Sequence, residues 1–402
     1  MPPAAPSGDF SSGPLRGVRL LDLSRVIAGP YIGRLFADLG AEVVKVEPPG
    51  GDDSRRIAPR HDQDMSALYT FANVGKRSIA LDLSRPEAVA TALDLVRASH
   101  AVVENFRPGV LDRLGLGWQA IQQVNPDACL LSISGFGSDS QWSDRRAYAP
   151  VVHAVAGVLD DQSRYAGQPV AQINDARADT TAALHGAVAL LAALRVVEHG
   201  GAGQHVELPM FDALLTSYTE VGAALLDPPD NRVMNPIYDA GPHGAVALAG
   251  AAQYVWGTLA EWDAKLVDPT PPGADLPTKA RLRHRAIEDW MAAHPSREAV
   301  LESLAEAGLA AAPVLPLPQV LRGEMARERD LLVTVDDRRG GTRRVVRPAA
   351  RFSGSANQVR GPAPRLGEHA DEVLRDVLGY DDARIASLRR SGALGPDTAP
   401  DD

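Results

Sequence analysis

The chain has 402 residues, of which 45% are hydrophobic and 23% are charged, as in an ordinary soluble globular protein. Its formal net charge of −10 argues against nucleic acid and anionic membrane surfaces as partners. The single cysteine, Cys129, excludes a disulfide framework and a cysteine-based metal site within the chain, and it fits a reducing cytoplasm.

The N-terminal part of the sequence predicts a parallel sheet. Residues 1–14 lack the basic start and the apolar core of a signal peptide and are expected to form a flexible leader. Residues 17–24 and 41–47 have the composition of strands, and residues 30–40 carry apolar side chains at helical spacing. A strand, a helix and a strand in this order form a βαβ unit, whose two strands run parallel.

The same alternation continues along the chain as far as residue 137. Strands are predicted at 76–83, 101–106 and 128–137, and a helix is predicted at 86–99. Repeated units of this kind predict a doubly wound α/β domain. No G-x-G-x-x-G or Walker loop follows the first strand, so nicotinamide and nucleoside triphosphate binding lose their strongest support.

The second half of the chain changes in composition. An Ala-rich helix at 178–198 is predicted to be buried, because its apolar stretch falls short of the ~20 residues that span a bilayer. Residues 223–281 are rich in proline and loop residues, which predicts a smaller, separate domain. The remaining predicted elements are a strand and helix at 205–215, a short strand at 244–250, helices at 281–294 and 296–308, antiparallel strands within 330–352, a closing helix at 363–380 and a disordered tail at 393–402.

The loop at 103–117, VENFRPGVLDRLGLG, is the most informative segment. The strand before it delivers Asn105, Phe106 and Arg107 to the carboxyl edge of the sheet, where open α/β folds bind their ligands. Arg113 follows on the next short helical pattern, so two guanidinium groups could converge on a phosphate. The simpler interpretation is a surface loop with two solvated arginines.

Seven segments in this order resemble CoA-transferase family III, a group that also contains acyl-CoA racemases. The resemblance implies a Rossmann-like, doubly wound large domain with a smaller α+β domain, in a cytoplasmic, interlocked homodimer. It divides the chain into the N-terminal part of a large CoA-binding domain at 1–220, a small domain with linkers at 221–329 and a segment at 330–402 that returns to the large domain. The segments that carry the resemblance are 17–56, 73–83, 103–117, 133–137, 179–194, 200–215 and 363–374.

Asp179 is the residue that the resemblance implies as the nucleophile, because it lies 15 positions before Leu194, the end of the LAAL segment. A carboxylate in the first turn of a helix is stabilised by free N–H groups and by the helix dipole. For an isolated aspartate at a helix start, the simpler interpretation would be a cap. Asp175 is the nearest competitor and has no such spacing.

The family chemistry moves CoA from an acyl-CoA thioester to a carboxylic acid, with CoA as a substrate and without a metal. The expected intermediates are an aspartyl mixed anhydride and an aspartyl-CoA thioester, which divide one difficult exchange into easier steps. Backbone N–H donors are expected around the oxyanions that form. The residues that the resemblance implies for CoA binding are Ala28, Leu81, Asp82, Ser84, Asn105, Phe106, Arg107, Arg113, Gly135, Phe136 and Tyr148.

Four cationic side chains outside this set, Lys76, Arg77, Arg55 and Arg56, are expected mainly as solvated surface charges, with phosphate contact as the alternative.

The sequence departs from the racemase branch at one important position. Racemases of the family carry a His, usually followed by Asp, where this chain has Tyr148 and Ala149. A tyrosine with an ordinary pKa of about 10 is a poor acid/base at neutral pH. His153 is expected to be a core or helix-surface residue, while the pair Tyr238 and Asp239 is closer to the racemase pattern.

The sequence therefore predicts a CoA-transferase that acts on acyl-CoA and carboxylic acids. A racemase or epimerase is the main alternative, and a non-catalytic acyl-CoA binding protein is the third. The flap that covers the aspartate in some transferases is replaced here by residues 235–250.

Overall fold

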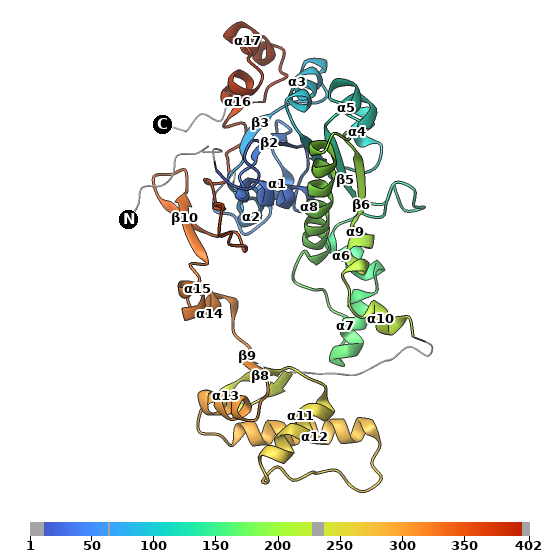
Figure 1. Ribbon diagram of the computed structural model, residues 1–402, viewed down its shortest axis with the longest axis vertical. Coiled ribbons are helices and arrows are strands. Elements are labelled where there is room, and N and C mark those ends of the chain that lie inside the picture. The colour runs from blue at the N-terminus through green and yellow to red at the C-terminus, as the bar shows by residue number, and fades with distance from the viewer. Residues whose placement is uncertain (1–11, 63–64, 227–236, 396–402) are drawn as a thin grey trace. The chain divides into compact units, whose positions relative to one another are not determined.

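The structure is a computed structural model that describes residues 12–62, 65–226 and 237–395 (Figure 1). It divides into two compact units. The large unit comprises residues 1–157, 172–221 and 330–402, and the small unit comprises residues 158–171 and 222–329.

The large unit is built on a six-stranded parallel sheet with the strand order β3-β2-β1-β4-β5-β6. The parallel, doubly wound sheet predicted from the sequence is thereby confirmed. Because the order reverses between β1 and β4, the loops that follow these strands diverge and leave a crevice at the carboxyl edge. The strands are β1 (Arg19–Asp22), β2 (Glu42–Glu47), β3 (Arg77–Ala80), β4 (Ala101–Glu104), β5 (Cys129–Ser134) and β6 (His205–Pro209).

Helices cover both faces of the sheet because the strand residues alternate between two apolar cores. Leu21 and Val102 belong to a core shared with α3, α5 and α17. The opposite face packs against α1 and α8. The helices named here are α1 (Ala28–Asp38), α3 (Pro86–Arg97), α5 (Trp118–Val124), α8 (Arg177–Glu198) and α17 (Asp382–Arg390).

Helix α8 approaches the sheet closely because of Gly186. A Cβ atom at this position would lie 2.8 Å from Ile32 Cδ1 and 3.0 Å from Leu131 Cδ2, so any larger residue would push α8 away. Among the described helices, α8 is also long and apolar enough to cross a membrane by length and composition, a test that core helices of soluble proteins pass as well. Its packing against α1, α9 and β5 buries one side of the helix, whereas Leu184 and Val188 are exposed, so the predicted burial is confirmed only in part.

Shorter elements complete the large unit. The strands β10 (Leu332–Asp336) and β11 (Thr342–Val346) form an antiparallel hairpin, as the sequence predicts. Val335 and Val345 of this hairpin share a small core with Tyr69. The other short elements are α2 (Ala67–Asn73), α4 (Val110–Arg113), α6 (Ala149–Val155), α9 (Met210–Thr216) and a 3-10 helix at Asp53–Arg56, and α10 (Val221–Ala224) lies at the boundary with the small unit.

The closing helix predicted at 363–380 is wrong in its first part. Helical structure begins only at α16 (Ala370–Glu372) and continues as a π-helical turn at Val373–Val377. The backbone before it is bonded elsewhere: Ser78 Oγ accepts a hydrogen bond from Gly367 N–H, and Ser78 O accepts one from His369 N–H. These long-range bonds replace the local bonds of a helix.

The sequence predicts a disordered C-terminal tail from residue 393. Residues 393–395 instead lie against the sheet, where Asp82 N–H donates to Ala393 O and Gly395 N–H donates to Ala80 O. Ala393 and Leu394 are buried. Residues 396–402, and residues 1–11 of the predicted leader, lie outside the described residues.

The small unit has its own α+β core. A three-stranded antiparallel sheet, β7 (Ile237–Asp239), β8 (Ala245–Leu248) and β9 (Ala311–Pro313), packs with helices around buried Trp256, Leu259 and Met291. The helices at 281–294 and 296–308 are confirmed with shifted ends. The helical elements of this unit are α7 (Val158–Ala166), α11 (Ala252–Trp262), α12 (Leu276–Ala292), α13 (Arg297–Glu306), α14 (Leu317–Val320), α15 (Glu324–Glu328) and a 3-10 turn at Gly241–His243.

Candidate active site

Three neighbouring cavities open along the carboxyl edge of the large unit's sheet. Cavity A has a volume of about 330 Å³, cavity B about 300 Å³ and cavity C about 150 Å³. Cavity A is lined by loops that follow β1, β4 and β5 and by the starts of α6 and α8. Its lining residues are Arg25, Val26, Asp53, Asn105, Phe106, Arg107, Pro108, Ile133, Ser134, Gly135, Ser143, Arg145, Arg146, Ala147, Tyr148, Asp179 and Met210.

Asp179 lies in cavity A, in the first turn of α8, with only 8% of its surface exposed. Its carboxylate accepts hydrogen bonds from its own N–H and from the N–H groups of Ala28 and Ala149. These donors lie in the first turns of three different helices, α8, α1 and α6, so three positive helix ends meet at one carboxylate.

Burial raises the pKa of Asp179 from 3.8 to about 6, while the three N–H groups act in the opposite direction. Within the described part of the chain, no cationic side chain contributes to this shift. At neutral pH the carboxylate is therefore ionised, poorly hydrated and oriented by fixed donors. These are the properties of an activated carboxylate nucleophile.

The Asn105 loop is tied to the loop that follows β1. Asn105 Oδ1 accepts a hydrogen bond of 2.8 Å from Arg25 N–H, and Asn105 Nδ2 donates one of 2.7 Å to Arg25 O. The guanidinium of Arg25 lies 5.6 Å from the centre of the Phe106 ring. Asn105 thus joins two cavity-lining loops with both atoms of its amide.

Cavity B begins where cavity A ends. Both are lined by Arg25, Asp53 and Phe106. The far wall of cavity B is largely apolar and brings together the predicted residues Leu81, Asp82 and Ser84 with Leu83, Pro48 and Pro49. The two cavities form a path from an apolar slot to the Asp179 carboxylate.

Cavity C is smaller and acidic. It is lined by Glu104, Asp112 and Glu207 and shares Phe106 and Arg107 with cavity A. Burial raises the pKa of Glu104 to about 7, although its carboxylate accepts a hydrogen bond from Phe106 N–H. The buried Glu104 side chain therefore holds the backbone of the Asn105 loop at Phe106.

Besides the residues of the Asn105 loop, two further predicted residues line cavity A with Asp179. Gly135 is required by a close approach, since a Cβ atom there would lie 2.2 Å from Ala147 Cβ. Tyr148 precedes α6 and is 56% exposed, so its ring is available to a ligand.

Three other predicted residues lie elsewhere. Phe136 is outside the three cavities and packs edge-on against Trp142 with ring centres 5.3 Å apart. Arg113 is exposed and lines none of the three, so the structure does not bring it together with Arg107 there. Ala28 is buried and reaches the site only through its N–H group.

Sequence reasoning missed three cavity-lining arginines, Arg25, Arg145 and Arg146. Arg145 lies over the Trp142 ring at 4.0 Å. Together with Arg107 they place four guanidinium groups around the cavity that holds Asp179. The adjacent pair RR at 145–146 was visible, but its position beside α8 depends on the folded loop.

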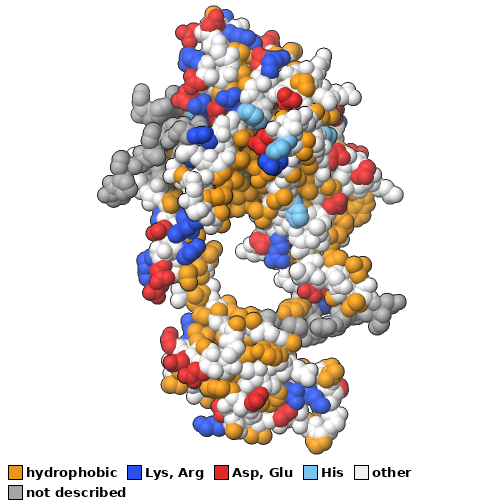
Figure 2. Space-filling model, viewed as in Figure 1, with side chains coloured by type: hydrophobic (Ala, Val, Ile, Leu, Met, Phe, Trp, Pro, Cys, Tyr) orange, Lys and Arg blue, Asp and Glu red, His pale blue; other side chains and the backbone are white. Residues whose placement is uncertain are grey.

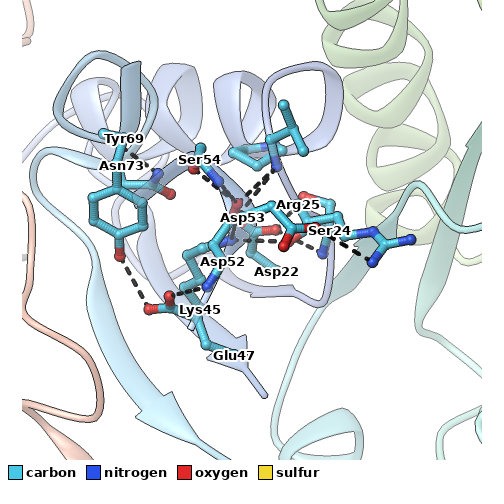
Figure 3. Close-up of polar contacts among 12 residues, drawn as sticks. Asp22, Ser24, Arg25, Lys45, Glu47, Asp52, Asp53, Ser54, Tyr69 and Asn73 are labelled. Carbon is cyan, nitrogen blue, oxygen red and sulfur yellow. Dashed lines mark hydrogen bonds and ion pairs between the residues drawn. The ribbon is translucent and has the colours of Figure 1, made fainter. Parts of the chain in front are cut away.

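A buried ionic cluster lies behind the β1 loop (Figure 3). Lys76 Nζ lies 2.7 Å from Asp22 Oδ2, and Lys45 Nζ lies 3.1 Å from Asp52 Oδ2. Arg55 donates to Glu47 at 2.7 Å. The expectation that Lys76 and Arg55 are solvated or contact phosphate is wrong, because both side chains are buried and form ion pairs with buried carboxylates.

The two remaining cations of that group lie nearer the surface. Arg56 is exposed, as expected, with its NH2 group 3.7 Å from Asp53. Arg77 is half-buried and lies 3.2 Å from Glu42.

Neither alternative base considered in the sequence lines cavity A. His153 is fully buried, and its Nε2 accepts a hydrogen bond of 3.1 Å from Ala178 N–H. It therefore supports the start of α8 beside Asp179. Tyr238 is buried in the small unit and stacks on His284 with ring centres 4.1 Å apart.

Within residues 12–62, 65–226 and 237–395, no group of three or more His, Cys, Asp or Glu side chains is arranged to hold a metal ion.

Comparisons with known proteins agree on one family. The family model described as CoA-transferase family III matches residues 15–370. The succinyl-CoA:L-malate CoA-transferase beta subunit of Chloroflexus aurantiacus is 30% identical over 95% of this chain and 98% of its own.

Two further relatives extend this result. A formyl-CoA:oxalate CoA-transferase of Rhodopseudomonas palustris is 32% identical over 95% of this chain and 97% of its own. The crystal structure of a CAIB/BAIF family protein from Brucella suis matches with a TM-score of 0.75 and 25% identity, covering 91% of this chain and 100% of that one.

Proposed function

The chain belongs to CoA-transferase family III, and we propose that it transfers CoA from an acyl-CoA thioester to a carboxylic acid with Asp179 as the covalent nucleophile. The observation that carries the proposal is the Asp179 carboxylate, which is buried, has no cationic partner among the described residues and is held by three backbone N–H groups in cavity A. Enzymic CoA transfer in general follows from family membership; the aspartyl route is the proposal.

The first half of the reaction moves CoA from the donor acyl group to Asp179. A carboxylate oxygen of Asp179 attacks the thioester carbonyl, and the carbon–sulfur bond breaks to give a mixed anhydride and CoA thiolate. The thiolate then attacks the Asp179 side of the anhydride and releases the donor acid as its carboxylate. Asp179 is left as a CoA thioester, and no proton or electron has to be supplied from outside.

The acceptor carboxylate reverses both steps. It attacks the aspartyl thioester to form a second anhydride, and the released thiolate takes the new acyl group while Asp179 returns as a free carboxylate. Each attack develops an oxyanion at the Asp179 end of cavity A. The N–H groups of Ala28 and Ala149 are placed to stabilise negative charge there.

Coenzyme A is proposed to occupy cavity B and reach into cavity A. The apolar wall that includes Leu81 suits the adenine and pantetheine parts, and Asp82 and Ser84 line the same slot. Phe106 lies where the two cavities meet, and the guanidinium groups of Arg25 and Arg107 suit phosphate oxygens. Tyr148 and Gly135 would face the thioester end.

Small dicarboxylic acids are the substrates to test first. The relatives named above are a succinyl-CoA:L-malate and a formyl-CoA:oxalate CoA-transferase. Arg145 and Arg146 in cavity A offer a second carboxylate a guanidinium partner beside the reacting one.

The direct test is CoA exchange between labelled acyl-CoA and a panel of mono- and dicarboxylic acids, followed by trapping of the enzyme with hydroxylamine. We expect acceptor-dependent new acyl-CoA and modification of Asp179. Modification of Asp175, or no modification while exchange proceeds, would contradict the nucleophile assignment. Binding of acyl-CoA without exchange or trapping would favour the binding-protein alternative.

The racemase alternative needs a second acid/base opposite Asp179. Position 148 holds Tyr, and His153 Nε2 already accepts a hydrogen bond from Ala178 N–H. We therefore expect a chiral 2-methylacyl-CoA to keep its α-proton in heavy water with and without acceptor. Rapid α-deuteration without any acceptor would reverse the assignment in favour of a racemase.

An interlocked homodimer in the cytoplasm is part of the proposal. Exposed apolar side chains lie along α8, where Leu184 and Val188 are 53% and 68% exposed. Figure 2 shows hydrophobic side chains gathered on this face of the large unit. A partner subunit would cover them. Light scattering after dilution should give the mass of two chains, and a folded monomer would contradict the dimer.

A further inference from the structure

The loop between β1 and α1 contains an unfavourable backbone conformation. Val26 has a φ of +68°. This left-handed region is rarely adopted by β-branched residues, so the surrounding structure must hold it in place. Two residues later, Ala28 N–H donates to the Asp179 carboxylate. The conformation at Val26 therefore sets the direction in which the chain enters α1.

Asp52 is the group that holds Val26. The Val26 N–H lies 3.1 and 3.2 Å from the two carboxylate oxygens of Asp52. Asp52 is only 2% exposed, and its position is fixed by Ser54 N–H at 2.8 Å and by Lys45 at 3.1 Å.

Lys45 holds Ser24, which lies two positions before Val26 in the same loop. Its Nζ donates to Ser24 O at 2.8 Å. Figure 3 shows Asp52 and Lys45 directed toward this loop from β2 and the segment after it. With Asn105 bonded to Arg25, three consecutive residues of the loop are each held by a side chain from another segment.

We propose that Asp52 is a positioning residue for CoA transfer, which acts through Val26 to aim the Ala28 N–H at Asp179. Asp52 touches no reacting atom itself. The kinetic part of this inference rests on the proposed function, while the structural part, the aim of the Ala28 N–H, does not depend on it.

A general structural role is the competing explanation, and the chain offers a matched control for it. Asp38 is another buried carboxylate, paired with Arg34 at 2.8 Å at the other end of α1. Asp38→Asn also breaks a buried ion pair but leaves the Val26 turn intact. An effect special to the loop must therefore appear in Asp52→Asn and be absent from Asp38→Asn.

The experiment measures kcat, KM for acyl-CoA and amide hydrogen exchange of the peptide 24–31 in both variants. For Asp52→Asn we expect kcat to fall roughly 10- to 100-fold with little change in KM, because a donor to the nucleophile is misplaced. Exchange of the peptide should become faster. Asp38→Asn should match wild type in both measurements.

A second pair of variants tests the strain itself. Val26→Pro cannot adopt the observed φ and removes the N–H, yet it leaves every buried charge in place, so it decides the matter if Asp52→Asn does not fold. In the Asp52→Asn background, Val26→Gly should restore part of kcat, because glycine adopts this conformation without support.

The inference is overturned if Asp52→Asn or Val26→Pro keeps the wild-type kcat, or if Asp38→Asn loses as much activity. If the wild-type protein transfers CoA between no pair tested, the proposed function fails and hydrogen exchange still decides the positioning role. Unchanged protection of peptide 24–31 in Asp52→Asn would then overturn it.

Discussion

Two buried carboxylate sites lie close together in the large unit and have opposite electrostatics. Asp179 and Asp52 are both nearly inaccessible, at 8% and 2% exposure. Burial raises the pKa of Asp179 to about 6, whereas at Asp52 the effect of burial is outweighed by Lys45 and by Ser54, and the pKa falls to about 2. At Asp52 the buried cation and the Ser54 donors together outweigh burial, whereas the three N–H groups at Asp179 do not.

The difference separates reactivity from support. Asp52 forms an ion pair with Lys45, and its oxygens accept hydrogen bonds from Val26 and Ser54. Its carboxylate is therefore not free to act as a nucleophile. Asp179 accepts only N–H groups and faces a cavity. The reactive carboxylate of Asp179 thus has no counter-charge among the side chains that the structure describes. The loop between β1 and α1 that helps to hold it is itself held by the ion pair of Asp52 and Lys45.

The largest expected effect follows from removing the charge of Asp179. Asp179→Asn should lower CoA transfer by about four orders of magnitude or more, because an amide is a poor nucleophile. Acyl-CoA binding should remain. The control is Asp175→Asn, which changes an exposed side chain and should retain activity. Residual transfer near the wild-type rate would show that Asp179 is not the nucleophile.

Asp179→Asn should also be more stable than the wild-type protein at neutral and alkaline pH. The folded pKa of Asp179, about 6, lies above its ordinary value of 3.8, so the folded state binds the proton more tightly and stability falls as pH rises between these values. At pH 8, Asp179→Asn should raise the free energy of unfolding by up to about 3 kcal/mol. Urea unfolding at pH 4 and pH 8 measures this, and an equal effect at both would contradict it.

The paired site should respond in the opposite way. Lys45→Met leaves Asp52 buried without its cation and should lower the free energy of unfolding by about 3–5 kcal/mol. Urea unfolding at pH 7 is the measurement. Arg97→Met, which removes an exposed partner of Asp94, is the matched control and should have little effect. A loss below about 1 kcal/mol in Lys45→Met would mean that the cluster is not needed as an ion pair.

The pH dependence of catalysis provides a further test of the comparison. Because only ionised Asp179 attacks, kcat should rise with pH and reach half of its plateau near pH 6. Asp52 should not titrate in this range, since its pKa lies near 2. A rate profile that is flat between pH 5 and pH 7.5 would contradict the unpaired, buried state of Asp179.

The smallest effect is expected at Asp53, the immediate neighbour of Asp52. Its side chain is 57% exposed and lies 3.8 Å from Arg25. Asp53→Asn should change the free energy of unfolding by less than about 0.5 kcal/mol. Thermal unfolding of Asp53→Asn and Asp52→Asn, measured together, tests this. Similar losses of stability in the two variants would contradict the distinction between buried and exposed carboxylates.

Local patterns in the sequence were sufficient for most of the scaffold. The parallel strands, the α8 helix and the hairpin at 330–352 follow from short-range hydrophobic periodicity and turn residues, which the folded state does not override. The family segments also singled out Asp179, and the structure places it in a cavity with Asn105, Gly135 and Tyr148.

Only the tertiary structure decided how charges and backbone groups are used. Lys76 meets Asp22 and Arg55 meets Pro364 O across 54 and 309 residues, so no local pattern could show that these cations are buried. The closing helix starts late because Ser78 takes the backbone N–H groups before it. Secondary structure depends on neighbours in sequence, whereas the protonation and position of a buried charge depend on neighbours in space.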